Sequence, residues 1–168
     1  RARTILIDPT DPARWLVGVE VGGVYETRDG GATWRLVRPG GNPDIHVMVR
    51  HSERPGLVFA STGFGRPIDD PQPRDQRIAG MFRSEDGGTT WAYEWQGMRP
   101  PYTRPLCMDG RAPHAVTVAS APTAFSSRED QGGAQAMIYQ RDDSRKGWRP
   151  LGDAAHSPSP QADSTRSG

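Results

Sequence analysis

Two octapeptides decide the fold of this chain: TRDGGATW at residues 27–34 and SEDGGTTW at residues 84–91. Their last residues, Trp34 and Trp91, are 57 positions apart, and one further step of 57 positions reaches Trp148. The segment before Trp148 is a decayed copy that keeps Asp143 at the matching position. Repetition at a fixed period indicates an architecture in which each repeat is one supersecondary unit that stacks on its neighbours.

The repeat extends upstream of each octapeptide into short apolar and β-branched runs. Residues 16–19, for example, align with residues 57–60 and 115–118. Such runs, bounded by Gly, Pro and Asp, predict strands, and 20 Gly and 16 Pro residues leave little room for long helices. The predicted strands are 3–8, 15–20, 23–28 and 34–38 in the first unit, 45–50, 57–62, 80–85 and 91–96 in the second, and 102–108, 115–120, 135–141 and 148–151 in the third.

Four antiparallel strands in each radially repeated unit are typical of a β-propeller blade. The predicted fold class is therefore all-β, a partial β-propeller of about three blades within residues 1–153. Residues 154–168 are small and polar and predict a disordered tail or the truncated start of a further blade. Because rings close with 4–8 blades, we expect a piece of a larger ring, or association through open blade edges. The predicted blades are 3–38, 45–96 and 102–151.

The octapeptide S/T-x-D-x-G-x-x-W stabilises the hairpin between the third and fourth strands of a blade. Asp29 can accept hydrogen bonds from turn amides, and Thr27 can add a second side-chain bond. Gly31 supplies a positive φ, and Trp34 covers the turn. We interpret the motif as structural, because a calcium loop needs more carboxylates. The equivalent structural residues are Ser84, Asp86, Gly88 and Trp91 in the second unit, and Asp143 and Trp148 in the third.

These octapeptides resemble the Asp-box, or BNR repeat, of sialidase-like and WD40/YVTN/BNR-like β-propellers of bacterial proteins. The resemblance covers roughly residues 3–153 and implies the fold. It does not imply one function, because the same repeat occurs in sialidases, xyloglucan-active glycoside hydrolases, sortilin-type receptors and a photosystem II assembly factor.

The catalytic signatures of this family are largely missing. The sialidase F/Y-R-I-P motif is absent, since residues 81–84 read MFRS. The stretch EVGGVY at residues 20–25 resembles the D-x-G-G-x-Y context of a catalytic Asp in the xyloglucan-active enzymes, with Glu20 in place of that Asp. Glycoside hydrolysis needs two carboxylates at a set separation, so Glu20 is a candidate for half of a catalytic pair.

The turns between second and third strands are the predicted ligand face. In an up-and-down blade these turns and the inter-blade links lie opposite the Asp boxes. Two of them, 63–79 and 121–134, are long for hairpins, and long loops on a rigid scaffold often carry function. A glycan or a protein could bind there. The candidate residues are Arg66, Asp69, Asp70, Arg74, Asp75, Arg128, Glu129 and Asp130.

Composition narrows the partners and cofactors. A net charge of +1 provides no field for nucleic acid or an anionic membrane, and no targeting or transmembrane segment is visible, which predicts a soluble chain without specifying its compartment. The four histidines, His46, His51, His114 and His156, show no metal-ligand spacing, and no cofactor motif occurs. The lone Cys107 is predicted to be a buried apolar residue.

Two functional interpretations stay open. The first is a binding or scaffold module without catalysis. The alternative is part of a glycoside hydrolase, sialidase-like or xyloglucanase-like, whose remaining site residues lie in other blades.

Overall fold

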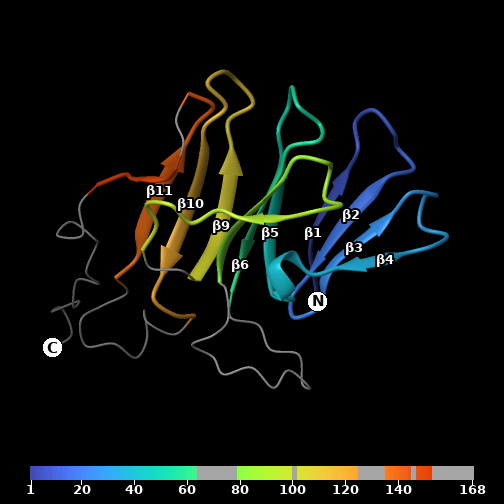
Figure 1. Ribbon diagram of the computed structural model, residues 1–168, viewed down its shortest axis with the longest axis horizontal. Helices are drawn as coiled ribbons and strands as arrows, with labels where there is room; N and C mark the ends of the chain where they lie inside the picture. The colour runs from blue at the N-terminus through green and yellow to red at the C-terminus, as the bar shows by residue number, and fades with distance from the viewer. Residues whose placement is uncertain (64–78, 100–101, 125–134, 145–146, 153–168) are drawn as a thin grey trace, which may run out of the picture.

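The computed structural model describes residues 1–63, 79–99, 102–124, 135–144 and 147–152. They form three four-stranded antiparallel sheets that stand side by side in chain order (Figure 1). The predicted all-β class with four antiparallel strands per unit is confirmed. The sheets comprise β1 (Ala2–Ile7), β2 (Trp15–Val19), β3 (Gly23–Thr27) and β4 (Arg35–Val37); β5 (Ile45–Arg50), β6 (Val58–Thr62), β7 (Gly80–Ser84) and β8 (Ala92–Tyr93); and β9 (Tyr102–Met108), β10 (Val116–Ala121), β11 (Met137–Arg141) and β12 (Arg149–Pro150).

The hydrophobic core lies between the sheets. Leu16 and Val24 of the first sheet pack with Ile45 and Phe82 of the second, and all four side chains are fully buried. A second cluster joins the second and third sheets through the side chains of Leu57, Phe59, Met81, Leu106, Val116, Val118, Tyr139 and Trp148. Burial of apolar surface, worth about 25 cal/mol per Å², is therefore gained by stacking one blade on the next.

In each sheet, residues paired across neighbouring strands form a row of side chains on one face, and the same row recurs in all three sheets. In the first sheet this row lies on a face that no other described sheet covers. In the second sheet, Phe82 belongs to a row that is buried against the first sheet. The equivalent row of the first sheet faces away from the second and includes Ile5, 61% exposed, and Leu36, 40% exposed. The rows are Ile5–Val17–Tyr25–Leu36, Met48–Ala60–Phe82–Tyr93 and Leu106–Val118–Tyr139.

Two sequence predictions are corrected by this pairing. Val17 pairs with Tyr25, and Ala60 pairs with the equivalent Phe82, so the alignment of residues 16–19 with 57–60 is wrong by two positions. A two-residue shift keeps every side chain on its own face of a strand, so the error does not change which residues face the neighbouring sheet. Cys107 is exposed rather than buried, because it alternates along β9 with the inward-facing Leu106.

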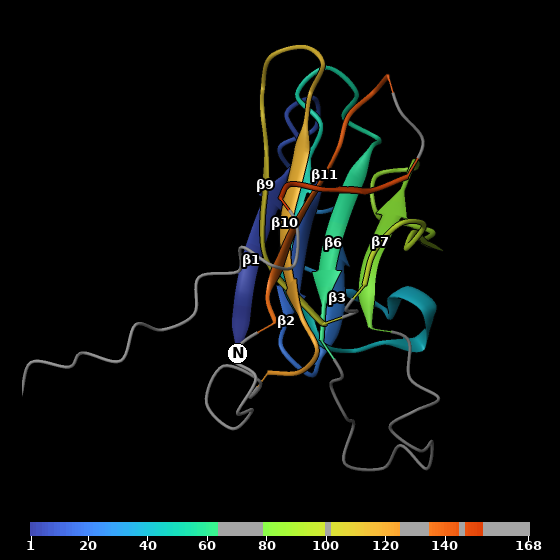
Figure 2. The ribbon, with the colours of Figure 1, turned by 90° about the vertical axis from the view of Figure 1, so that its left-hand side faces the viewer.

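The connections gather at two opposite ends of the sheets. The β1–β2, β5–β6 and β9–β10 turns lie at the upper end in Figures 1 and 2. The opposite end is formed by the turn at 20–22, Gly63, residues 121–124 and the link at 38–44, which contains η1 (Pro39–Gly41). We call this end the second-turn face. Within the described residues, no helix has the length and apolar character needed to cross a membrane.

Candidate functional site

The link between the first two blades holds Glu20 on the second-turn face. The amides of Gly22 and Gly23 donate to the Pro43 carbonyl at 2.9 and 2.7 Å, and the Glu20 amide donates to the Arg1 carbonyl at 2.9 Å. Gly23 has a φ of 89°, and a Cβ there would lie 2.8 Å from the Val37 carbonyl oxygen. The Gly-Gly turn is therefore what lets the chain place Glu20 directly beside the link to the second blade.

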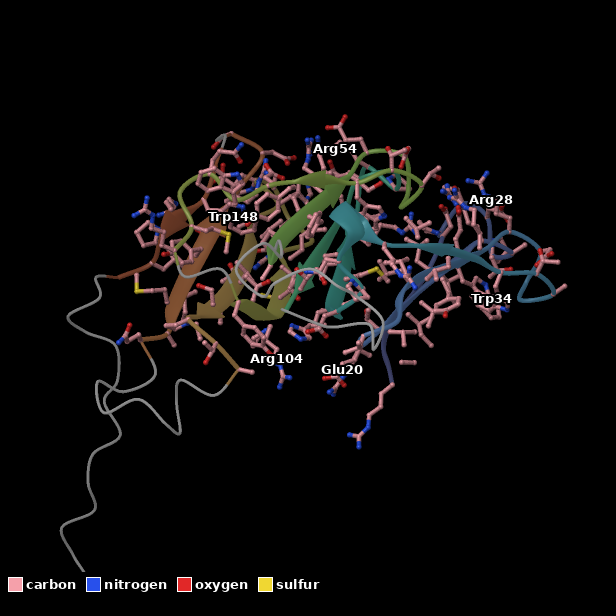
Figure 3. The ribbon with its side chains drawn as sticks, turned by 60° about the horizontal axis from the view of Figure 1, so that its bottom comes forward. Glu20, Arg28, Trp34, Arg54, Arg104 and Trp148 are labelled. Carbon is pink, nitrogen blue, oxygen red and sulfur yellow. The ribbon has the colours of Figure 1, made fainter. Side chains whose placement is uncertain are left out.

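Arginines from two blades engage the Glu20 carboxylate. Nε and Nη2 of Arg3, on β1, donate to Oε2 of Glu20 at 2.9 and 2.5 Å. Nη2 of Arg104, on β9 of the third blade, lies 3.8 Å from Oε1. Glu20 and Arg104 lie near each other on the same side of the molecule in Figure 3, away from Arg54. Strands β1 and β9 thus bring Arg3 and Arg104, which are 101 positions apart in sequence, to one carboxylate.

Two buried side chains of the second blade lie next to Glu20. Asp44 is 7% exposed and His46 is 4% exposed. The Asp44 amide donates to Oδ1 of Asn42 at 2.8 Å, which fixes the link just before β5. His46 Nε2 lies 3.5 Å from Asp44 Oδ1, and the Tyr102 ring stands edge-on to the imidazole at 5.2 Å. Burial raises the pKa of Tyr102, although the charge of Arg104 opposes the increase.

Within the described residues, two groups of three side chains hold possible metal-ligand atoms within 4.8 Å of one another. They are Glu20, Asp44 and His46 on the second-turn face, and His51, His114 and Asp143 at the opposite end. The members of each group come from different strands and turns and are distant in sequence. For this reason the spacing of the histidines along the chain gave no sign of metal ligands. A nearby His and Asp two positions apart, Asp44-x-His46, was the one local signal.

The two complete Asp boxes are closed by their own side chains. Asp29 accepts hydrogen bonds from the Thr33 amide at 2.9 Å and from both threonine hydroxyls, Thr33 at 2.5 Å and Thr27 at 2.8 Å. These bonds lower the pKa of Asp29 to about 2. Burial raises the pKa of Asp86, but bonds from Thr90 and Ser84 outweigh it and lower that pKa to about 2. All these interactions stay within the hairpin, so both carboxylates stabilise their own turns.

The tryptophans of these boxes behave alike. Trp34 Nε1 donates to the Gly31 carbonyl at 3.0 Å, and Trp91 Nε1 donates to the Gly88 carbonyl at 2.9 Å. The third unit differs: Trp148 Nε1 donates across to the Glu94 carbonyl of the second blade at 3.1 Å. The decayed box therefore joins two blades instead of covering its own turn.

Asp143, at the matching position of the third unit, also makes contacts to the second blade. Its Oδ2 lies 3.1 Å from Nε2 of His51, and its Oδ1 pairs with Arg54. Burial raises the pKa of Asp143, but the hydrogen bond from His51 and the charge of Arg54 outweigh it and lower that pKa. Its neighbour Asp142 instead accepts the Ser144 amide at 2.9 Å.

A cavity of about 600 Å³ lies between the second and third blades. Arg141 is half-buried there, pairs with Glu94 and stacks over the Phe59 ring at 5.2 Å. Burial and the neighbouring charge of Arg83 lower the pKa of Arg141. The lining residues are Arg54, Leu57, Arg83, Glu94, Gln96, Arg141, Asp143, Ser144 and Gly147.

The loop candidates lie outside the described residues. They are Arg66, Asp69, Asp70, Arg74, Asp75, Arg128, Glu129 and Asp130. The described residues at the loop ends, Gly63 and Ala121, belong to the second-turn face, as the blade topology predicted. Sequence reasoning selected Glu20 but missed Arg3, Asp44, His46 and Arg104.

Comparison with known proteins supports the fold. No protein-family model matches the chain, and no curated protein does. The GH74 enzyme of Niastella koreensis superposes with a TM-score of 0.65 and 15% identity, over 94% of this chain and 22% of that one. The GH74 xyloglucanase of Xanthomonas campestris gives 0.57 and 16%, over 88% of this chain and 22% of that one.

A second group of similar structures is YCF48. The protein from Cyanidioschyzon merolae superposes with a TM-score of 0.54 and 18% identity, over 89% of this chain and 39% of that one, and another structure holds YCF48 bound to D1 peptide. The chain thus spans about a fifth of the GH74 chains and about two fifths of the YCF48 chain. Together with the three sheets, these similarities define the class: a three-bladed segment with the fold of Asp-box β-propellers.

Proposed function

We propose that the chain is a binding module that recognises a polar ligand, a glycan or a peptide, on its second-turn face. The observation that carries this proposal is the meeting of charged side chains from three blades: Arg3 and Glu20, Asp44, and Arg104. Guanidinium and carboxylate groups held in fixed positions give the paired hydrogen bonds that sugar hydroxyls and peptide groups require. The similar structures include a xyloglucanase and a YCF48 protein bound to a peptide, which agrees with either ligand.

The ion pairs of Glu20 favour binding over catalysis. A glycoside hydrolase needs one carboxyl group that delivers a proton to the leaving oxygen and a second that acts on the sugar. Glu20 accepts two bonds from the Arg3 guanidinium at 2.9 and 2.5 Å and faces Arg104 as well. A carboxylate held in a fixed orientation by two guanidinium groups is suited to positioning a ligand.

The binding proposal is tested by isothermal titration calorimetry with xyloglucan oligosaccharides and with D1 peptide. A double variant, Arg3→Gln with Arg104→Gln, is expected to lose at least tenfold in affinity for the ligand that binds. Arg111→Gln is the matched control, because the Arg111 side chain is 89% exposed and lies in the turn between β9 and β10, at the opposite end of the sheets. Equal affinity of the double variant and the wild type would place the ligand elsewhere and refute the proposal.

A glycoside hydrolase is the second proposal, and it rests on the carboxylates of Glu20 and Asp44. Their nearest oxygens lie within 4.8 Å, close to the separation of about 5–5.5 Å used by retaining enzymes. The test is release of reducing ends from xyloglucan. Turnover by the wild type that disappears in Glu20→Gln would establish the enzyme, whereas no turnover, or turnover unchanged by Glu20→Gln, removes this proposal.

We also propose that the chain works as part of a larger ring. Support comes from the open row that includes Ile5 and Leu36, because the equivalent row of the second sheet, around Phe82, is buried against a preceding blade. A fourth blade with an inward face like that of Leu16 would cover it. Analytical ultracentrifugation tests the alternative, association of copies through this face, which would give a concentration-dependent dimer that a charge at Ile5 abolishes.

A further inference from the structure

The imidazole of His46 is held in one orientation by its neighbour. Nδ1 of His46 lies 2.5 Å from the Thr103 carbonyl oxygen, and both groups are buried. A carbonyl oxygen only accepts hydrogen bonds, so Nδ1 must carry the proton and donate it. In the neutral ring, Nε2 therefore keeps its lone pair. A histidine whose other ring nitrogen donates to a backbone carbonyl is the usual arrangement of a metal ligand.

The lone pair of His46 faces a carboxylate oxygen that lacks a partner. Oδ1 of Asp44 lies 3.5 Å from Nε2, and it accepts no hydrogen bond from any residue that the structure describes. Asp44 is 7% exposed, and a buried acceptor left without a partner is destabilising. Gly63 leaves room beside it, because a Cβ at that position would lie 2.4 Å from Oδ2 of Asp44. Two acceptors that face each other in a buried space call for a cation between them.

Glu20 supplies a third ligand from the first blade. One of its carboxylate oxygens lies within 4.8 Å of the ligand atoms of both Asp44 and His46. The distance of 3.5 Å between Nε2 and Oδ1 is close to the edge of about 3.4 Å of a tetrahedron whose ligands lie about 2.0–2.1 Å from the metal. A small movement of Glu20 toward Asp44 completes three ligands, with the fourth position open to water.

We propose that Glu20, Asp44 and His46 bind one divalent transition-metal ion of the Zn²⁺ type at the junction of the first two blades. An imidazole nitrogen with two carboxylates suits Zn²⁺ or Co²⁺, whereas Ca²⁺ and Mg²⁺ prefer oxygen ligands alone. The charges of Arg3 and Arg104 oppose a cation, so we expect micromolar rather than picomolar affinity. The inference goes beyond the proposed ligand binding, because the ion is bound by the free protein.

The second histidine group provides the contrast that makes this assignment specific. Nδ1 of His51 accepts the amides of Glu53 and Arg54, both at 3.1 Å, so the ring proton resides on Nε2. That proton points at Oδ2 of Asp143, 3.1 Å away, and Arg54 pairs with the same carboxylate. A proton and a guanidinium already occupy the place that a metal ion would take, and His51 has no lone pair to offer there.

The experiment titrates Zn²⁺ into the full chain, freed of any affinity tag, by calorimetry, and records the visible absorption of the Co²⁺ form. We expect one equivalent of Zn²⁺, a Co²⁺ spectrum of a four-coordinate site, and binding of Ca²⁺ at least a hundredfold weaker. His46→Asn should weaken Zn²⁺ binding at least tenfold, because the Asn amide keeps a donor for Thr103 but removes Nε2. Asp143→Asn is the matched control and should bind Zn²⁺ like the wild type.

Several outcomes would overturn the proposal. They are no stoichiometric Zn²⁺ binding, equal affinity for Ca²⁺, or a loss in Asp143→Asn in place of His46→Asn. NMR of the imidazole that shows His46 doubly protonated at neutral pH in the presence of Zn²⁺ would assign an ion pair with Asp44 instead. Circular dichroism checks that each variant folds, and Glu20→Gln, at a partly exposed site, repeats the test if His46→Asn does not. Because metal binding is measured without glycan or peptide, its failure is separate from failure of the ligand proposal.

Discussion

Blade stacking predicts unequal costs for the same substitution in the two Asp boxes. Gly88 has a φ of 97°, and a Cβ there would lie 2.5 Å from Cδ1 of Leu16 in the preceding blade. Gly31, at the same position of the first box, has a φ of 98°, but its nearest neighbour would be Cζ2 of Trp34 at 3.6 Å. Both Gly88→Ala and Gly31→Ala therefore carry the cost of a left-handed backbone, but only Gly88→Ala adds a steric conflict.

The magnitudes follow from these two terms. A left-handed backbone costs an alanine about 1–2 kcal/mol, and this term is shared by both variants. Forcing a methyl group into the packed contact with Leu16 costs about 1–3 kcal/mol more, because the leucine must leave its rotamer or the blades must separate. We expect Gly88→Ala to lower the free energy of unfolding by about 2–5 kcal/mol and Gly31→Ala by about 1–2 kcal/mol.

Urea unfolding followed by tryptophan fluorescence measures both variants under one set of conditions. The difference between the two free energies of unfolding is the quantity of interest, since the shared backbone term cancels. Equal losses, within about 0.5 kcal/mol, would show that the second Asp box does not press on Leu16 in solution. That result would refute the stacking of the first two blades described above.

Three further predictions concern charge and packing. Asp86→Asn should cost about 1 kcal/mol at pH 7, because the roughly 2.5 kcal/mol implied by lowering its pKa from 3.8 to about 2 must be reduced for an exposed group. Because the pKa of Asp86 is lowered, its ionised carboxylate stabilises the fold above about pH 4, and this stabilisation is lost as pH falls toward 2. In urea unfolding at pH 7, 4 and 2.5, the free energies of unfolding of the wild type and the variant should therefore converge as pH falls. A constant difference between them would contradict this. Glu26→Gln should cost about 2 kcal/mol in thermal unfolding, because the buried Glu26 carboxylate pairs with three arginines, two of them more than half exposed. A loss below about 0.5 kcal/mol would mean that these pairs do not form. Leu16→Ala should lower the free energy of unfolding in urea by about 3 kcal/mol, and the exposed control Ile5→Ala should lower it by less than 1 kcal/mol. Comparable losses in the two variants would show that the face around Ile5 is covered in solution.

Local features of the chain could be predicted because their causes are local. The hairpin that contains Asp29 is closed by contacts no more than four positions apart, so its residues are visible as a motif. Strand bounds follow from runs that alternate or end at Gly and Pro, and the predicted strand 45–50 agrees with β5 to the residue. The all-β class and the number of strands per blade needed nothing more than this period.

The register of the second strands could not be predicted in the same way. Tyr25 and Phe82 are equivalent and lie 57 positions apart, but their partners Val17 and Ala60 do not. The reason is that the turns between second and third strands differ in length between units. Only hydrogen bonding between strands decides which residues are opposite. The error of two positions shows how a correct motif can accompany an incorrect alignment.

The sequence by itself determined the blade: four strands, an Asp-box hairpin and an apolar face, each encoded within one repeat. The sequence also selected Glu20, but the tertiary structure alone decided which residues surround it. Glu20, His46 and Arg104 belong to three different blades, and none is adjacent in sequence to another. Their meeting depends on how the inner strands β1, β5 and β9 stack side by side. A local sequence pattern predicts the strands on which or next to which these residues lie. The distances between the residues are set by packing between blades, which a local pattern does not predict.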